Sequence, residues 1–271
     1  MDAFLYNCCL LPKSQRDGIT VVLVRPRNPL NIGAAARAMA NFGFARLAVV
    51  APYAPNWREA RSAVGAPEVL ADAAEFATLG EAVADCALVA GTASRGARKP
   101  DQRTGMLPEL PQLVRRSFAR GGRVALVFGP EKHGLTRDDL ARCHVLVEIP
   151  TASRQPSMNL GQAVAVCLYE LAVRGRGPET EDSAEEEPGS AATVVASGDV
   201  DRLAGVLEEA MIASGFSPAA MRKANRMDLQ LLLRKLSFTE KDARRSLGVF
   251  RRILWRLRHP PDAGGGGGVS H

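Results

Sequence analysis

Three short polar segments contain the residue types of a catalytic or ligand-binding site, and each begins where an apolar run typical of a β-strand ends. They cover residues 25–37, 128–135 and 149–160. Amide, carboxylate and guanidinium side chains occur in them beside glycines, and this combination can orient a substrate and stabilise developing charge. Among their residues are Asn31 and Arg37 in the first segment, Gly129 and Glu131 in the second, and Ser157 and Asn159 in the third.

Each segment also has a purely structural interpretation. Asn31, Ser157 and Asn159 are residue types that cap the N-terminus of a helix, so a turn followed by a cap would explain each segment taken alone. Arg37 is explained less well in this way, because it lies in an alanine-rich stretch typical of a closely packed helix. Both interpretations stay open at this point.

The motifs of the common enzyme classes are missing. No G-x-G-x-x-G follows the first apolar run, which disfavours a Rossmann dinucleotide site or an ordinary methyltransferase. The segment from Gly129 resembles a phosphate loop, but Leu135-Thr136 stands where such a loop needs Lys-Ser/Thr. The sequence has no G-x-S-x-G, and its Cys and His residues form neither a C-x-x-C pair nor H-E-x-x-H. We therefore expect no metal site and no disulfide framework.

Residues 19–174 alternate short apolar runs with helical patterns, which predicts an α/β domain with a parallel sheet. Such a sheet binds ligands at the carboxyl ends of its strands, where the three polar segments lie. The predicted strands are 19–24, 46–50, 86–91, 123–128 and 144–149, and the predicted helices are 30–42, 57–64, 79–84, 111–119, 136–142 and 159–173.

The rest of the 271-residue chain divides by composition. Residues 1–18 are predicted to be an N-terminal extension, 175–199 an acidic flexible linker and 259–271 a disordered glycine-rich tail. Residues 200–258 predict a small all-α C-terminal domain of three amphipathic helices. Their apolar stripes are Leu203, Val206, Leu207, Ala210 and Met211; Leu229, Leu232, Leu233 and Leu236; and Ala243, Leu247, Phe250, Leu254 and Leu257.

The net charge of +6 conceals a strong segmentation. Between residues 179 and 199 the chain has seven acidic residues and no basic one, whereas the chain on both sides is basic. A polyanion that contacts both basic parts is therefore an expected partner, although basic surfaces also serve solubility alone. No apolar run approaches the roughly 18 residues of a membrane span, and Asp2 stands where a secretory signal has basic residues, so we expect a cytoplasmic protein without a membrane segment.

The last predicted helix, which follows Thr239, has a cationic face that carries an aromatic residue. At 100° per residue its basic side chains lie opposite the apolar stripe, with Trp255 among them. Such a face suits phosphate contact combined with base stacking in RNA. A solvated face, with Trp255 packed against a neighbouring helix or subunit, fits the pattern equally well. The candidate RNA-binding residues are Arg244, Arg245, Arg251, Arg252 and Trp255.

In combination, the three polar segments resemble the signature motifs of the SPOUT superfamily of knotted methyltransferases, in the TrmH-like branch that methylates RNA ribose 2′-hydroxyls. The resemblance covers about residues 19–174, and the motifs occur in order at family spacing. Residues 91–95 resemble a further cofactor-loop segment of the tRNA cytidine/uridine 2′-O-methyltransferases. The matching residues are Asn31 and Arg37 in the first motif, Gly129, Glu131, Gly134 and Leu135 in the second, and Ile149, Pro150 and Ser157-Met158-Asn159-Leu160 in the third.

This resemblance implies a C-terminal trefoil knot, a homodimer and S-adenosylmethionine bound in the knot. It also implies methylation of tRNA, at a cytidine or uridine at the start of the anticodon loop, with the C-terminal helices holding the tRNA body. The implied cofactor-binding residues are Thr92, Ala93, Ser94, Gly129, Ile149, Pro156, Ser157 and Met158, and the implied catalytic residues are Asn31, Arg37, Glu131, Ser157 and Asn159.

The role of Arg37 follows from the chemistry of a ribose hydroxyl, which is a poor nucleophile until its proton is removed or polarised. The family assigns the base role to the arginine of the first motif, yet a guanidinium group has a pKa above about 12 and stays protonated. We therefore prefer an electrostatic clamp, in which Arg37 holds the adjacent phosphate and stabilises developing alkoxide charge. His133 beside Glu131 is the alternative base, although a single loop histidine is more often a surface residue.

Three other functions remain to be weighed. A sibling enzyme could methylate ribosomal RNA or another tRNA position. A noncatalytic RNA-binding protein would use the basic surfaces alone and bind RNA in a salt-dependent manner without the cofactor. A structural dimer would use the motifs only as caps and turns.

Overall fold

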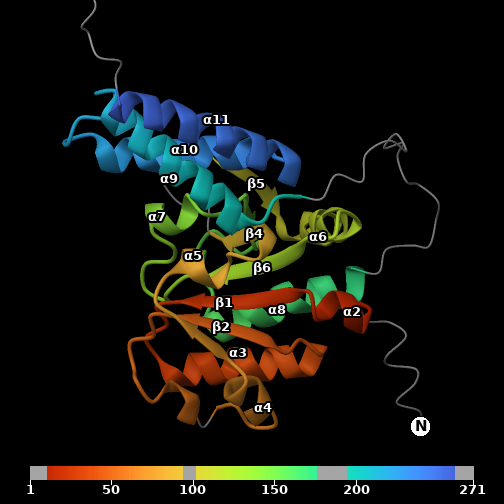
Figure 1. The fold of residues 1–271 in the computed structure, drawn as a ribbon. Coiled ribbons are helices and arrows are strands. Elements are labelled where there is room, and N and C mark those ends of the chain that lie inside the picture. Colours follow the sequence, from red (N-terminus) through yellow and green to blue (C-terminus); the bar gives the residue numbers. More distant parts are fainter. Residues whose placement is uncertain (1–10, 61, 94–101, 176–193, 260–271) are drawn as a thin grey trace, which may run out of the picture.

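One sheet of seven parallel strands organises the N-terminal part of the chain, and three long helices follow it (Figure 1). The computed structural model describes residues 11–60, 62–93, 102–175 and 194–259. The strand order is β3-β2-β1-β6-β4-β7-β5. The strands are β1 (Ile19–Val24), β2 (Arg46–Val50), β3 (Ala74–Phe76), β4 (Cys86–Thr92), β5 (Arg103–Met106), β6 (Arg123–Phe128) and β7 (Val145–Glu148).

The predicted parallel α/β sheet is confirmed, and all five predicted strands are present. Two further strands, β3 and β5, form the edges and were not predicted. Both are short and mostly exposed, so their sequences have no buried apolar run. The central strand β1, in contrast, is buried along its whole length.

Helices cover both faces of the sheet, and the alternation of side chains along β1 separates two cores. Val21 and Leu23 belong to the core beneath α3 (Pro29–Phe42) and α8 (Leu160–Arg174), whereas Val22 and Val24 belong to the core beneath α5 (Leu79–Ala82) and α7 (Arg137–Leu140). The helices of this part are α2 (Lys13–Arg16), α3 (Pro29–Phe42), α4 (Pro67–Ala71), α5 (Leu79–Ala82), α6 (Leu110–Ala119), α7 (Arg137–Leu140) and α8 (Leu160–Arg174).

The helix predicted at 57–64 is wrong. The structure has a single 3-10 turn at Trp57–Glu59, and α4 begins only at Pro67. The Trp57 side chain is buried, donates its indole N–H to Glu75 Oε2 at 3.0 Å, and is covered by the Arg58 guanidinium. The Trp57 side chain is therefore held by contacts with Glu75 and Arg58 and not by the packing of a helix.

The three long helices pack around a core of their own. They are α9 (Ser197–Ala213), α10 (Arg222–Lys235) and α11 (Glu240–Arg258), and α9 contacts both of the others. Leu203, Leu233 and Ala243 are buried in this core. Leu232 and Leu236, predicted to share the apolar stripe of α10, are instead exposed, because α10 packs on α9 along a narrow seam that contains Leu233.

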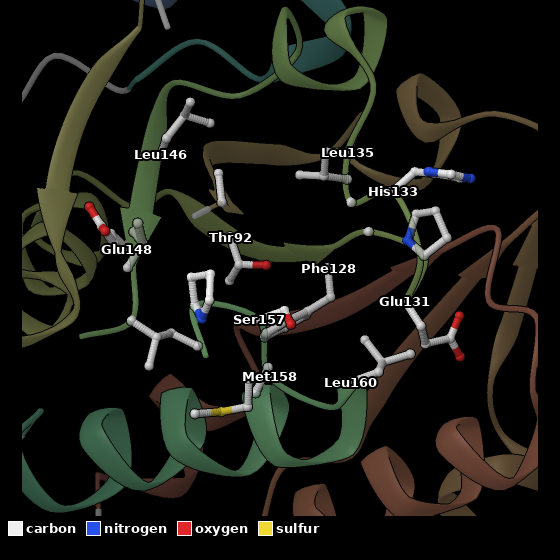
Figure 2. A pocket seen from close by; sticks show the side chains of 18 of the residues that line it. Thr92, Phe128, Glu131, His133, Leu135, Leu146, Glu148, Ser157, Met158 and Leu160 are labelled. Atoms are coloured by element: carbon white, nitrogen blue, oxygen red, sulfur yellow. The ribbon is translucent and has the colours of Figure 1, made fainter. Parts of the chain in front are cut away.

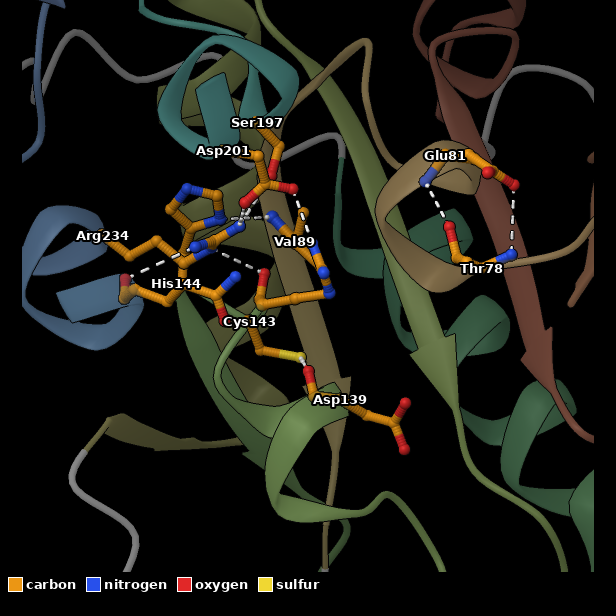
Figure 3. Close-up of polar contacts among 11 residues, drawn as sticks. Thr78, Glu81, Val89, Asp139, Cys143, His144, Ser197, Asp201 and Arg234 are labelled. Atoms are coloured by element: carbon orange, nitrogen blue, oxygen red, sulfur yellow. Dashed lines mark hydrogen bonds and ion pairs between the residues drawn. The ribbon is translucent and has the colours of Figure 1, made fainter. Parts of the chain in front are cut away.

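A buried arginine attaches the three helices to the sheet (Figure 3). The Arg234 side chain is 2% exposed and donates to Asp201 Oδ1 at 2.7 Å, to the Arg142 carbonyl at 3.0 Å and to Ser197 Oγ at 3.4 Å. Arg142 donates to the other oxygen of Asp201 at 2.6 Å. Asp201 therefore joins one cation from α10 to another from the segment before β7.

His144 lies beside this junction (Figure 3). Its Nδ1 accepts a hydrogen bond from the Val89 amide at 3.0 Å. Burial, and secondly the charge of Arg234, lower the pKa of His144 to about 3, so the imidazole is neutral near pH 7. Burial likewise raises the pKa of the Cys143 and Cys167 thiols to about 12, as expected for cysteines that pack in a core.

Replacing Arg234 tests the strength of the junction. We expect Arg234→Met to lower the free energy of unfolding by about 2 kcal/mol, because it leaves the Arg142 carbonyl and the buried Ser197 hydroxyl without their donor. Urea denaturation measures the change. Arg202→Met is the control: this exposed arginine pairs with Asp199 on the surface, so its loss changes stability by less than about 0.5 kcal/mol. Equal effects of the two variants would contradict the prediction.

Candidate active site at the carboxyl edge of the sheet

The sheet order brings the three polar segments to one edge. β1 and β6 are neighbours, and β7 is separated from β6 by β4. Since all strands are parallel, the loops that follow β1, β6 and β7 leave from the same side of the sheet. Segments more than a hundred residues apart in the sequence therefore meet there.

A chain of side-chain hydrogen bonds joins the three segments. The Asn159 side chain caps α8, because its Oδ1 accepts from the Gly161 backbone amide at 2.9 Å. Its Nδ2 donates to Asn31 Oδ1 at 3.0 Å. The side-chain Nδ2 of Asn31 in turn donates to Glu131 Oε1 at 2.8 Å. Asn159 thus does more than cap α8, because its side chain also binds Asn31 in the first turn of α3. Asn28, not Asn31, caps α3.

Glu131 is held as a carboxylate. Partial burial alone would raise its pKa, but hydrogen bonds from the Asn31 side chain and from the backbone amides of Glu131, Arg27 and Asn28 lower that pKa below its ordinary value. A carboxylate that is ionised throughout the neutral range accepts hydrogen bonds but has little basicity. Its geometry therefore suits an orienting group and not a general acid or base.

The segments after β6 and β7 enclose a cavity of about 410 Å³ (Figure 2). This volume lies within the range of small-molecule sites. Figure 2 shows Glu131 and Glu148 on opposite sides of it, with Thr92 and Ser157 between. The predicted site residues in its wall are Thr92, Ala93, Gly129, Glu131, Ile149, Pro156, Ser157 and Met158.

The remaining predicted residues lie elsewhere. Asn31 and Asn159 are outside the cavity wall but are bonded to Glu131 as described. Ser94 lies outside the described residues. His133 lines the cavity. Arg37 is exposed on α3, does not line the cavity and makes no hydrogen bond or ion pair with the residues that the structure describes.

The sequence analysis missed two polar wall residues, Thr104 and Glu148. Glu148 ends β7 and is paired in register with Met106 of the neighbouring strand β5. The rule that selected the polar segments, a polar residue at the carboxyl end of a strand, would have selected Glu148 as well. Thr104 lies on β5, whose sequence gave no signal of a strand.

Tight backbone packing shapes the loop after β6. A Cβ atom on Gly129 would lie 2.4 Å from the backbone of Gly134 and Leu135, so only glycine allows this approach. Gly134 has a φ of 63°, which closes the loop. The loop therefore folds back on itself and lines the cavity with main-chain groups beside Thr92, whose hydroxyl donates to the Val127 carbonyl at 3.1 Å.

The predicted RNA-binding residues all lie on α11 and are exposed. Trp255 is 45% exposed, with the Arg252 guanidinium over its ring and the His259 ring stacked on it. Trp255 therefore belongs to the cationic face and is not buried against a neighbouring helix. Within the parts of the chain that the structure covers, no cluster of three metal-ligating side chains occurs, and no helix has the length and apolar character to cross a membrane.

Comparison with known proteins agrees with this geometry. Residues 18–169 match the model of the SpoU rRNA Methylase family. A tRNA (cytidine/uridine-2′-O-)-methyltransferase TrmJ from Sodalis glossinidius is 30% identical over 263 residues, covering 92% of this chain and 97% of its own length. The tRNA (cytidine-2′-O-)-methyltransferase TrmJ from Methanocaldococcus jannaschii is 39% identical over 155 residues, which is 56% of this chain and 66% of that protein.

Among solved structures, TrmJ from Z. mobilis ZM4 is similar with a TM-score of 0.73 and 32% sequence identity, over 86% of this chain and 98% of that one. The family match spans the three motif segments, and the similarity to TrmJ extends over most of the chain. These findings confirm the resemblance seen in the motifs: the chain belongs to the SpoU rRNA methylase family.

Proposed function

We propose that this protein transfers a methyl group from S-adenosylmethionine to a ribose 2′-hydroxyl of tRNA, at a cytidine or uridine at the start of the anticodon loop, as a cytoplasmic homodimer. The observation that carries the proposal is the hydrogen-bonded chain Asn159–Asn31–Glu131 at the rim of the cavity. The similarity to TrmJ proteins over most of the chain supports the tRNA ribose as the substrate.

The cavity fits the cofactor in size and in chemistry. It combines an apolar wall, from residues such as Leu146 and Met158, with the closely packed glycine loop, whose main-chain groups can hydrogen-bond an adenine. The cofactor supplies a methyl group that its sulfonium has already activated. The residues proposed to hold it are Thr92, Ala93, Ser94, Gly129, Ile149, Pro156, Ser157 and Met158.

Arg37 is the proposed electrostatic clamp on the substrate. It projects from the exposed side of α3 with no partner among the described residues, and it is therefore free to bind a phosphate and the developing alkoxide. Glu131 stays ionised and holds Asn31, while Asn159 fixes Asn31 to the start of α8. Ser157 lies in the cavity wall, where its hydroxyl can orient the ribose.

The homodimer is proposed from the face that α3 and α8 share. α3 and α8 pack closely, since a Cβ on Gly161 would lie 2.6 Å from the Ala34 Cβ. Along α8, the apolar side chains Val166, Tyr169 and Val173 are exposed at helical spacing, and Tyr169 contacts Phe42 of α3 edge to face. Docking a second subunit here would cover these side chains and bring Arg37 into the interface region.

Three finer structural assignments belong to the proposal. The segment from β7 into α8 forms the trefoil knot. In support of this, α8 follows β7 but packs against α3, which follows β1, and β6 and β4 lie between these two strands. Helices α9 to α11 form a separate C-terminal domain, since they share one core. Arg244, Arg245, Arg251, Arg252 and Trp255 on α11 contact the tRNA. Most of the predicted linker and all but His259 of the tail lie outside the described residues.

The direct test is incubation of the protein with unmodified tRNA and S-adenosylmethionine. We expect one ribose methylation at the start of the anticodon loop, mapped by resistance of that phosphodiester to alkaline cleavage. Methylation of ribosomal RNA alone would redirect the substrate. RNA binding without any heat in a calorimetric titration with S-adenosylmethionine would favour a noncatalytic RNA-binding protein.

Arg37→Lys tests the clamp. Lysine keeps the positive charge but loses the planar fork of donors, so we expect kcat to fall by about 10²- to 10³-fold. The affinity for S-adenosylmethionine, measured by calorimetry, is expected to stay unchanged because Arg37 is outside the cavity wall. Arg116→Lys, on the exposed surface of α6, is the matched control and keeps full activity. Full activity of Arg37→Lys would exclude both the clamp and the base role.

The Glu131 carboxylate gives the hydrogen-bonded chain a defined pH dependence. Because its folded-state pKa is lowered, it contributes stability above the ordinary carboxyl pKa of 4.5 and loses it as pH falls through the folded-state value. We expect Glu131→Gln to be less stable than the wild type near pH 7, with a difference that shrinks below pH 4.5. Thermal unfolding from pH 3 to 8 measures this. Glu68→Gln, exposed on α4, is the control, and a pH-independent difference for Glu131→Gln would contradict the prediction.

A further inference from the structure

An exposed aromatic residue with a guanidinium group on its ring lies at the rim of the site. Tyr53 is 74% exposed, the highest value for any large apolar side chain in the described parts of the chain. The Arg27 guanidinium carbon lies 5.3 Å from the centre of its ring. Arg27 is also exposed. Neither side chain contributes to a buried core, so packing does not account for the pair.

The backbone conformation of two adjacent loops brings these two residues together. Arg25 and Ala51 directly follow the neighbouring strands β1 and β2, and both have left-handed conformations, with φ of 47° and 43°. Non-glycine residues rarely adopt this conformation, and such strain clusters at functional sites. The Tyr53 amide donates to the Pro26 carbonyl at 3.2 Å, which ties the two loops to each other.

A buried carboxylate holds the first of these loops in place. The Arg25 guanidinium forms a two-pronged ion pair with Asp139 of α7, whose side chain is 7% exposed. Asp139 also accepts from the Thr136 amide at 2.7 Å. Burial would raise the pKa of Asp139, but the hydrogen bonds from Arg25 and Thr136 lower it. The loop that carries Arg27 is therefore anchored to α7 by this ion pair.

The pair is joined directly to the proposed catalytic residues. The Arg27 amide donates to Glu131 Oε2 at 3.4 Å, while the other oxygen of the same carboxylate accepts from Asn31. The exposed ring of Tyr53 is thus connected through Arg27 to Glu131, which is a member of the hydrogen-bonded chain.

We propose that Tyr53 and Arg27 form a stacking subsite for an unpaired nucleobase of the RNA, next to the nucleotide that is methylated. This inference rests on the proposed function. An aromatic face accepts any base, and a guanidinium group adds cation–π attraction and charge toward the neighbouring phosphate. The subsite fixes the register of the strand, so that the correct 2′-hydroxyl is presented to the reaction.

Tyr53→Ala tests the subsite in the full-length protein with unmodified tRNA. Loss of one base stack weakens binding about 5- to 150-fold, so we expect KM for tRNA to rise at least fivefold. Tyr53→Phe keeps the ring and should retain KM within about twofold. The affinity for S-adenosylmethionine, measured by calorimetry, should not change. Val64→Ala removes an apolar side chain that is 66% exposed just before α4, away from every proposed RNA contact, and is the control, expected to leave KM unchanged.

A second readout detects stacking itself. We expect an anticodon stem-loop with 2-aminopurine beside the target nucleotide to show fluorescence quenching on binding the wild type and Tyr53→Phe, but not Tyr53→Ala. If the wild type methylates tRNA and Tyr53→Ala has the same KM and quenching, the subsite is wrong and the proposed function stands. If the wild type does not methylate tRNA, the proposed function fails and the subsite with it. Dissociation of the dimer by Tyr53→Ala, seen by sedimentation with unchanged KM per dimer, would assign the ring to the subunit interface instead.

Discussion

The hydrogen-bonded chain from Asn159 through Asn31 to Glu131 is the interaction on which the site depends. Its three members are Asn159 at the start of α8, Asn31 in the first turn of α3 and Glu131 in the loop after β6, so a displacement of any of these segments would break it. The parallel sheet supplies the convergence, since every strand delivers its loop to the same edge. The cavity, the glycine loop and the start of α8 all take their positions from this edge.

A second constraint sets where an RNA could be held. The three C-terminal helices contact the sheet through Arg234, which meets Asp201, Ser197 and the carbonyl of Arg142 in a buried junction. Arg142 lies just after α7, and α7 contributes Asp139 to the ion pair with Arg25. Asp201 lies on α9, against which α11 packs, so the helices that carry the basic face and the loop after β1 are both anchored close to α7. Such an arrangement favours one fixed geometry between the two surfaces proposed to contact tRNA.

The sequence predicted the parts of the molecule that depend on strong local patterns. Buried strands such as β1 consist of consecutive apolar residues, and the three motifs identified the loops of the site. Edge strands β3 and β5 were missed because an edge needs little burial, and Thr104 was missed with β5. The bond between Asn31 and Asn159 could not be predicted from capping propensity, because it is a tertiary contact between two helix starts. The cap of α3 is Asn28, whose side chain accepts from the Leu30 backbone amide.

The position of Arg37 gives the proposed homodimer a chemical reason. The cavity wall formed by the described residues contains Lys132 but no arginine, and only arginine offers a planar fork of donors to a phosphate. Arg37 is exposed on α3, and α3 packs against α8, whose apolar residues Val166, Tyr169 and Val173 are exposed. Burial of these side chains against a second subunit would move Arg37 from open solvent into the interface without any change within the subunit. A dimer would then complete a site for which each subunit alone provides the cavity and the orienting groups.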